Sequence, residues 1–226
     1  MELVYTINRS PKRKKLTITV ERDRSVVVHA PESTSEENIR AIFESKRQWI
    51  YEKTRHAQKY ALPYPPGKGL VNGESALYLG RQYQIEVVQD GSEEIRFEQR
   101  FLIPSRLSGE GKHVLRNWYM DRAKEKILPR ATKLASDLGV EFANARIVDN
   151  RYRWGSCTTR DSINFNWRLI KAPMYVVDYV IVHELAHLLE SNHTPRFWNI
   201  VRAQSAKMDK AKQWLLENGQ MLEEDI

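Results

Sequence analysis

The stretch Val182-His183-Glu184-Leu185-Ala186-His187-Leu188-Leu189-Glu190-Ser191-Asn192-His193 decides how the rest of the chain is interpreted. Two histidines four residues apart on a helix lie on one face, about one turn apart, so the imidazoles of His183 and His187 can converge on one ion. Glu184 can face the open coordination position and hold a water molecule without binding the metal itself. The spacing therefore predicts a zinc site with Glu184 as the general base.

A third ligand is expected from His193. A catalytic zinc ion usually takes three ligands from the protein and leaves its fourth position for water. The helix has to end between His187 and His193, and Ser191-Asn192 supplies a stop because Asn tolerates the left-handed conformation found at helix C-termini. Thr194-Pro195 then predicts the N-cap and first-turn proline of a new helix. This turn would bring the His193 ring back toward the other two.

The competing interpretation of these histidines is a structural zinc site or a pair of core histidines. Structural zinc sites usually fill all four positions and favour cysteine, whereas the chain has a single cysteine, Cys157. A His-Glu-x-x-His motif is expected by chance on the order of 0.01 times in a chain of this composition. The catalytic interpretation is therefore favoured.

The sequence around this stretch resembles a known family. The run H-E-L-A-H-L-L-E-S-N-H-T-P-R-F-W, which starts at His183, and the upstream segment Arg153-Trp154-Gly155-Ser156-Cys157 resemble the YgjP-like metallopeptidases, relatives of the SprT and WLM zincins. Residues 73–83 resemble the same family more weakly. The third histidine also has the metzincin spacing, but Glu190 stands where that group has glycine, which argues against a metzincin.

The resemblance implies a zinc-dependent metallopeptidase that hydrolyses peptide bonds through a zinc-activated water. It implies zinc on His183, His187 and His193, and Glu184 as the catalytic acid and base. The implied partner is a peptide or protein substrate. Some SprT and WLM relatives are proteases linked to DNA-bound protein adducts, which makes an association with nucleic acid an analogy to test.

The segment Arg153-Trp154-Gly155 is the expected substrate-binding strand. In zincins the sheet edge beside the cleft commonly pairs with an extended substrate backbone. Gly155 would leave room for that backbone, and the Arg153 guanidinium can bind a carboxylate or polarise a carbonyl oxygen. The alternative, which we weigh equally, is a hairpin whose Trp154 and Cys157 fill the core. Asp178 could orient His183, although a charge near the helix N-terminus is the favoured role.

Composition predicts a folded protein without a membrane span. The 226 residues are 41% hydrophobic and can bury a large core, in one large domain or two small ones. The N-terminus lacks the apolar segment of a signal peptide, and no stretch approaches the roughly 20 apolar residues of a membrane helix. One cysteine excludes an internal disulfide bond and fits a reducing compartment. We therefore expect a cytoplasmic protein.

The positive charge indicates acidic partners. The formal net charge is +7 and the pI is about 9.4, which is compatible with nonspecific nucleic-acid binding, although a solvated basic surface is the commoner explanation. The densest basic run, from Arg9 to Lys15, contains a proline and lies between strand-like segments, so a charged hairpin loop fits it. No base-reading motif is visible, and any binding is expected to involve phosphates.

The order of elements predicts an α+β protein in two parts. Residues 1–105 are expected to form a strand-rich unit with one long helix. Its elements are an antiparallel meander of strands at about 3–8, 16–21 and 26–28, a helix from about 34 to 60, a Pro- and Gly-rich linker at 63–69, and strands at 76–88 and 95–103.

Residues 106–226 are expected to form the zincin-like catalytic domain, a small sheet packed on the metal-binding helix. A helix at 111–138 would be kinked or divided at Pro129 and stopped by Gly139. A strand would begin near Ile147. Strands at 153–158 and 162–170 would follow, the second with one buried and one solvated face, and then a metal helix opened by Pro173 and two amphipathic helices at 197–208 and 211–218.

Two other functions remain open at this point. One is a nucleic-acid-binding or partner-binding module with a structural zinc site and no turnover. The other is an amidase that acts on a small molecule. A covalent mechanism has no support, because Cys157 has no histidine partner in its own segment.

Overall fold

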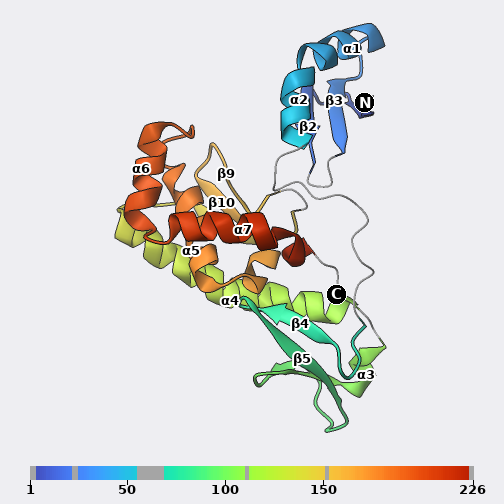
Figure 1. The fold of residues 1–226 in the computed structure, drawn as a ribbon, viewed down its shortest axis with the longest axis vertical. Coiled ribbons are helices and arrows are strands. Elements are labelled where there is room, and N and C mark those ends of the chain that lie inside the picture. Colours follow the sequence, from blue (N-terminus) through green and yellow to red (C-terminus); the bar gives the residue numbers. More distant parts are fainter. Residues whose placement is uncertain (1–3, 22–24, 55–68, 110–111, 151–152, 224–226) are drawn as a thin grey trace. The chain divides into compact units, whose positions relative to one another are not determined.

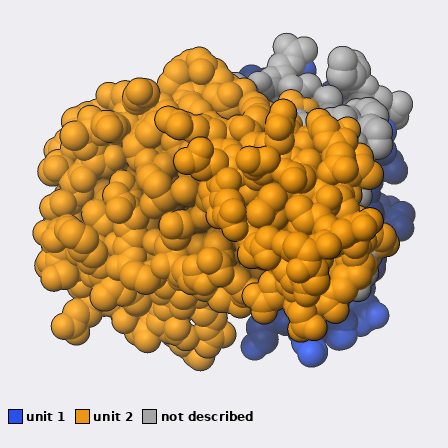
Figure 2. Space-filling model, turned by 90° about the horizontal axis from the view of Figure 1, so that it is seen from below, with its two compact units in different colours: residues 1–63 blue, residues 64–226 orange. Residues whose placement is uncertain are grey.

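The computed structural model describes residues 4–21, 25–54, 69–109, 112–150 and 153–223. The chain divides into two compact units, unit 1 (Met1–Pro63) and unit 2 (Tyr64–Ile226), which Figure 2 shows in different colours. This division differs from the expected boundary at 105/106, because the strands that follow residue 69 share one hydrophobic core with the C-terminal helices. Most of the expected linker at 63–69 lies outside the described residues.

Unit 1 contains a three-stranded sheet in the order β1-β3-β2. The central strand β3 (Val26–Pro31) pairs in parallel with β1 (Thr6–Ser10) and antiparallel with β2 (Thr17–Val20). The expected antiparallel meander is therefore wrong. Val28 on β3 is fully buried, which fits a strand enclosed by two neighbours. Because β1 and β2 do not pair, the basic run joins the two outer strands and is not the loop of a hairpin.

Two helices, α1 (Glu36–Ser45) and α2 (Arg47–Thr54), replace the single helix expected at 34–60. The Ser35 hydroxyl accepts a hydrogen bond from the Asn38 N–H and so caps α1 at its N-terminus. The last residues of the expected helix lie outside the described part of the chain. These helices contribute three buried side chains to the small core of unit 1: Ile39, Phe43 and Ile50.

Unit 2 begins with a four-stranded sheet in the order β4-β5-β7-β6. Its strands are β4 (Ser75–Tyr78), β5 (Arg81–Val88), β6 (Arg96–Phe97) and β7 (Phe101–Pro104).

Both strands expected in this region are broken by tight turns. Leu79 and Gly80 have φ angles of 49° and 82°, and they form a two-residue turn that folds β4 back on β5. Gln99, with φ of 58°, lies in the turn between β6 and β7. Gly80 also lies so close to Pro173 that a side chain at this position would collide with it. These turns therefore need residues that tolerate positive φ.

The short helix α3 (Ser105–Ser108) precedes α4 (Lys112–Leu138), which runs unbroken over 27 residues with Pro129 inside it. Pro129 does not divide the helix. Gly139, with φ of 71°, follows its last residue as expected. Residues four apart form a fully buried stripe along α4, which explains its place in the core: Leu115, Tyr119, Ala123, Ile127 and Ala131.

A second sheet has the order β8-β10-β9, formed by β8 (Asn144–Val148), β9 (Gly155–Cys157) and β10 (Ser162–Asn166). The strand expected at 162–170 ends at Asn166, and a 3-10 helix, η1 (Trp167–Lys171), follows it. Asn166 is fully buried, which contradicts the expected solvated face.

The remaining helices are α5 (Met174–Ala186), α6 (Pro195–Gln204) and α7 (Met208–Glu223). Helix α5 contacts α4, α6 and α7 and also β9 and β10, which explains why it has so few exposed residues. Figure 1 shows α4 between the α5–α7 helices and the β4–β5 hairpin. None of the helices described is long and apolar enough to cross a membrane.

Candidate functional site

The three histidines singled out in the sequence converge at the end of α5. His183 lies in the last turn of the helix, His187 follows its final residue as the C-cap, and His193 lies in the loop before α6. The Nε2 atoms of His183 and His193 are 3.1 Å apart, and one ring nitrogen from each of the three residues lies within 4.8 Å of the others. The chain therefore gathers three nitrogen donors around one point.

The turn that brings His193 back is built partly as expected. The Thr194 hydroxyl accepts a hydrogen bond from the Phe197 N–H, and Pro195 occupies the first turn of α6. The end of α5 differs from the expectation, because the helix stops at Ala186 and not at Ser191-Asn192. Asn192 is also absent from the described residues with positive φ.

Aromatic rings hold the three imidazoles in place. Phe197 is fully buried, and its ring centroid lies 4.9 Å from His183, 4.6 Å from His187 and 4.7 Å from His193. The Trp198 ring stacks on His193 at 5.6 Å. Both aromatic residues belong to the first turns of α6. The start of α6 therefore supports all three histidines from one side.

The protonation state of the histidines favours metal binding. Burial lowers the pKa of His183 to about 3, with a further contribution from nearby positive charge, and burial also lowers the pKa of His193. Their rings are thus neutral near pH 7 and offer lone pairs. His187 Nδ1 lies 3.2 Å from the Glu190 carbonyl oxygen, a contact that directs its Nε2 toward the other histidines. The buried His183 Nδ1 has no hydrogen-bond partner among the described residues.

The geometry fits a zinc ion. Nitrogens bound at about 2.0–2.1 Å to one tetrahedral zinc lie roughly 3.3 Å from one another, close to the His183–His193 separation. Three imidazoles are also a common donor set for zinc with one position left open. His183, His187 and His193 are therefore the residues that could hold the metal.

Glu184 is 7% exposed and lies against the edge strand β9. The Cys157 backbone N–H donates a hydrogen bond to its carboxylate. Burial raises the Glu184 pKa to about 7, although the positive charge of Arg153 and the Cys157 hydrogen bond lower it. A methyl group on the α-carbon of Gly155 would lie only 2.5 Å from Glu184 Cγ and 2.7 Å from Oε1. Gly155 therefore makes room for Glu184 itself.

An open cleft of about 440 Å³ joins the histidines to β9. Its lining includes His183, His187, His193 and Glu184, together with Arg153, Gly155, Ser156, Cys157, Thr158, Thr159 and Ser191. Of the three expected substrate-binding residues, Arg153 and Gly155 line the cleft, whereas Trp154 is partly buried against the main core. Cys157 lines the cleft and also packs against that core. The segment therefore lies partly along the cleft and partly against the core, and its role in substrate binding stays a prediction.

Asp178 has neither role considered for it. Its carboxylate forms two contacts with the Arg130 guanidinium on α4, one of them 2.6 Å long from Nη2 to Oδ2. Helix α5 has no acidic residue in its first turn. Asp178 therefore ties α5 to α4 through an ion pair and does not orient His183.

Two residues near the site were not identified from the sequence. Phe197 contacts all three histidine rings, and its only sequence signal was its place after Thr194-Pro195 at the start of a helix. Asn166 supports the segment that carries Arg153, and its alternation with apolar residues had suggested a solvated side chain. Neither set of contacts follows from the spacing of apolar residues alone.

Comparison with solved structures finds only partial likenesses. Two solved structures are similar to part of the chain, the metallopeptidase zymogens jannalysin from Methanocaldococcus jannaschii and abylysin from Pyrococcus abyssi. Jannalysin is 19% identical, with a TM-score of 0.38, over 41% of this chain and 96% of its own. Abylysin is 21% identical, with a TM-score of 0.36, over 43% of this chain and 93% of its own. Likenesses this low carry no argument about function.

Sequence families give a clearer result. A search of curated proteins finds no match. The YgjP-like family, described as a YgjP-like metallopeptidase domain, matches residues 14–218, a range that contains all three histidines and Glu184. Because this match covers most of both units, the chain belongs to the YgjP-like metallopeptidases, a family of metal-dependent peptidases.

Proposed function

We propose that the protein is a zinc-dependent peptidase with a zincin-like active site, in which His183, His187 and His193 hold the metal and Glu184 is the general base. The observation that carries this proposal is the buried Glu184 carboxylate beside three converging imidazoles in one open cleft. A bound zinc ion supplies Lewis acidity, which polarises a carbonyl oxygen and makes water more acidic.

The chain's own groups account for the proton transfers. The Glu184 carboxylate accepts a proton from the attacking water and donates it to the leaving amine nitrogen. The Cys157 N–H and the α-carbon of Gly155 hold the Glu184 side chain in one position, so that its oxygens stay directed at the cleft. Fixed orientation of this kind is a large part of catalysis. No covalent intermediate with the protein is needed.

The peptide is expected to bind along β9. This strand lies at the end of the β8-β10-β9 sheet, and among the described residues only β10 pairs with it. An extended peptide can add to such an edge through main-chain hydrogen bonds. Gly155, Ser156 and Cys157 all line the cleft, so a peptide added here would pass in front of the histidines.

Changing Glu184 to Gln tests the mechanism. The substitution keeps the shape of the side chain and removes the base, so zinc content should be unchanged and hydrolysis of a generic protein substrate should fall by about a hundredfold or more. The measurement is the initial rate of cleavage by the zinc-loaded proteins. Comparable turnover in the two proteins would reject Glu184 as the base. Absence of cleavage in both would favour a binding module or a small-molecule amidase.

Metal analysis tests the ligand set. The purified protein is expected to contain about one zinc per chain, because three imidazoles converge. His193→Ala removes the ligand supplied by the loop and should weaken zinc binding and abolish cleavage, as should a chelator applied to the unchanged protein. The measurement is elemental analysis with a competition titration. Unchanged zinc affinity in the variant would show that another residue completes the site.

A further inference from the structure

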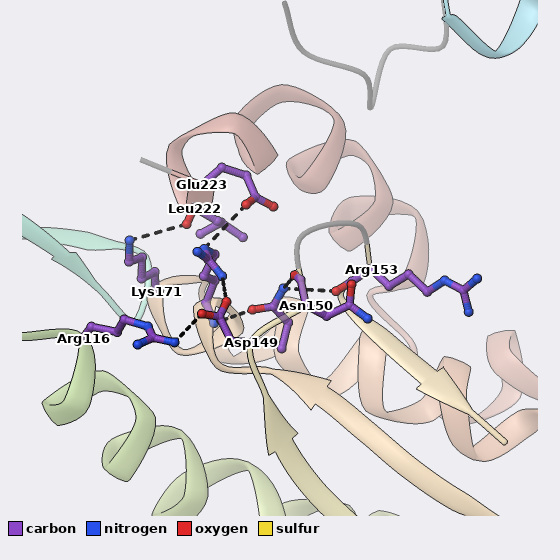
Figure 3. Close-up of polar contacts among 9 residues, drawn as sticks. Arg116, Asp149, Asn150, Arg153, Lys171, Leu222 and Glu223 are labelled. Atoms are coloured by element: carbon purple, nitrogen blue, oxygen red, sulfur yellow. Dashed lines mark hydrogen bonds and ion pairs between the residues drawn. The ribbon is translucent and has the colours of Figure 1, made fainter. Parts of the chain in front are cut away.

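Asn166 is a fully buried polar side chain that no catalytic role explains. Its Nδ2 donates hydrogen bonds to the carbonyl oxygens of Asn150 at 2.5 Å and Arg153 at 3.1 Å (Figure 3). Its backbone N–H donates to the Trp154 carbonyl oxygen at 2.8 Å. Its Oδ1 accepts from the Arg168 N–H at 3.0 Å. One residue of β10 thus holds three carbonyl groups of the segment that leads into β9.

The same segment is tied to the rest of unit 2 through Arg168. The Arg168 side chain is 11% exposed and pairs with Asp149 at 2.5 Å and with Glu223, in the last turn of α7, at 3.5 Å. Arg116 on α4 also pairs with Asp149 (Figure 3). Asp149 and Asn150, which follow β8, are therefore tied to α4, η1 and β10, and Arg168 of η1 is tied in turn to α7.

Arg153 differs from these arginines, because its side chain forms no ion pair with any residue that the structure describes. Figure 3 shows its guanidinium extending away from the polar network. The side chain is exposed and lines the cleft that contains Glu184 and the three histidines. Among the described residues that line this cleft, Arg153 is the one lysine or arginine. Arg153, whose carbonyl oxygen is held by Asn166, thus presents an exposed cation to the cleft, where its charge also acts on Glu184.

We propose that Asn166 is a positioning residue that holds Arg153 at the mouth of the cleft, where its guanidinium selects peptides that carry a carboxylate near the scissile bond. This inference rests on the proposed peptidase function and adds a substrate class to it. A guanidinium matches a carboxylate with two parallel hydrogen bonds. Glu184, the acidic residue in the lining, is buried beneath β9 and already accepts from Cys157.

Exposure favours this role over a direct role at the reacting carbonyl. A group that stabilises charge in the transition state works best where water is excluded, whereas Arg153 is exposed at the rim. An exposed cation on a fixed backbone can still recognise an exposed acidic side chain or a C-terminal carboxylate. The two roles differ in kinetics, since recognition acts mainly on KM and transition-state stabilisation acts on kcat.

The test uses pairs of peptides that differ only by Glu or Gln at one position near the cleaved bond. The zinc-loaded wild-type protein should cleave the Glu peptide better at one such position. Arg153→Gln should remove roughly ten- to hundredfold of that preference, through KM and not kcat. Arg202→Gln, which neutralises an exposed arginine on α6 outside the cleft, should leave it intact. An equal loss of kcat for both peptides would overturn the proposal.

Asn166→Asp keeps the acceptor for the Arg168 N–H and loses the donors to Asn150 and Arg153. This variant should also reduce the preference for the Glu peptide. Thermal melting and circular dichroism check that it folds, and Asn166→Ser replaces it if it does not. If Asn166 acts through Arg153, the double variant discriminates no worse than Arg153→Gln alone. Independent, additive losses would show that Asn166 acts elsewhere.

A binding measurement separates this inference from the proposed function. Calorimetry with the metal-free protein and the same peptides needs no turnover, and the Glu peptide should bind more tightly only when Arg153 and Asn166 are both present. If the zinc-loaded protein cleaves no peptide and the tighter binding of the Glu peptide persists, the peptidase proposal fails and the positioning of Arg153 stands. If cleavage occurs without any preference for the Glu peptide, the inference fails alone.

Discussion

Gly155 shows how one missing side chain can set the position of the proposed catalytic base, Glu184. We expected a glycine here to admit the substrate backbone, but the nearest atoms belong to Glu184, whose Cγ and Oε1 would lie 2.5 Å and 2.7 Å from an added methyl group. Its neighbour two residues on, Cys157, donates its N–H to the Glu184 carboxylate. The edge strand β9 therefore contacts Glu184 in addition to offering an edge for a peptide.

Gly155→Ala should displace Glu184 without removing it. A shift of about 1 Å in a reacting group can cost on the order of a hundredfold in rate, so kcat should fall by about ten- to a hundredfold while zinc content stays unchanged. Steady-state kinetics with elemental analysis would measure both. Ser162→Ala, a change on the neighbouring strand β10 outside the cleft lining, is the matched control. Wild-type kcat in Gly155→Ala would mean that Glu184 has another position during catalysis.

The convergence of the three histidines was predictable because its signal is local. Helical spacing brings His183 and His187 together, and Thr194-Pro195 indicates the start of the next helix. The surrounding support was not predictable. Phe197 packs against histidines that precede it by up to 14 residues, and Asn166 bonds carbonyl groups 13 and 16 residues before it, contacts that the spacing of apolar residues does not predict.

At the scale of elements, the errors in the expected strands have a common cause. Apolar alternation continued through Leu79-Gly80 and through Trp167, but the chain turns at both places. The Leu79–Gly80 turn is fixed by contacts from elsewhere, since the Leu79 and Gly80 N–H groups donate to carbonyl oxygens of η1 at 3.0 Å and 2.7 Å, whereas at Trp167 the Asn166 side chain caps the new helix. The alternation of apolar residues therefore predicts which side chains are buried but not where the chain turns.

Helix α4 contains a proline, Pro129, and its effect on stability can be tested. Pro129 is exposed and lies well inside the 27-residue helix, so it lacks the N–H that would bond the Glu125 carbonyl oxygen. Pro129→Ala should raise the free energy of unfolding by about 1–3 kcal/mol. Chemical denaturation would measure it, with Lys126→Ala on the same helix as the control for a change in composition. A destabilised variant would indicate that the fixed φ angle of Pro129 stabilises the protein by more than the missing hydrogen bond costs.

For the whole molecule, the candidate active site and most of the net positive charge lie in different units. The candidate metal site and its cleft lie in unit 2, and each unit has its own core. Residues 1–63 hold 13 lysines and arginines against 8 aspartates and glutamates, a net charge of +5 out of +7 for the chain. The basic character noted in the sequence is thus concentrated in the unit that lacks the candidate active site.

This distribution makes the run from Lys12 to Lys15 the first place to test for nucleic-acid binding. All four side chains are exposed in the connection between β1 and β2, although the Arg13 guanidinium also donates to the Thr17 hydroxyl at 3.0 Å. Binding to duplex DNA is expected to involve phosphates, to show little sequence preference and to weaken steeply with salt.

Replacing all four residues by Gln should lower DNA affinity and flatten its dependence on salt, because each lost phosphate contact removes roughly 0.9 from the slope of log K against log salt concentration. Fluorescence anisotropy at several salt concentrations would measure both quantities. The control replaces four exposed lysines of unit 2 by Gln: Lys124, Lys126, Lys133 and Lys210. An equal loss in both variants would indicate attraction by net charge alone. Unchanged affinity and slope in the first would leave the run as solvated surface with no part in binding.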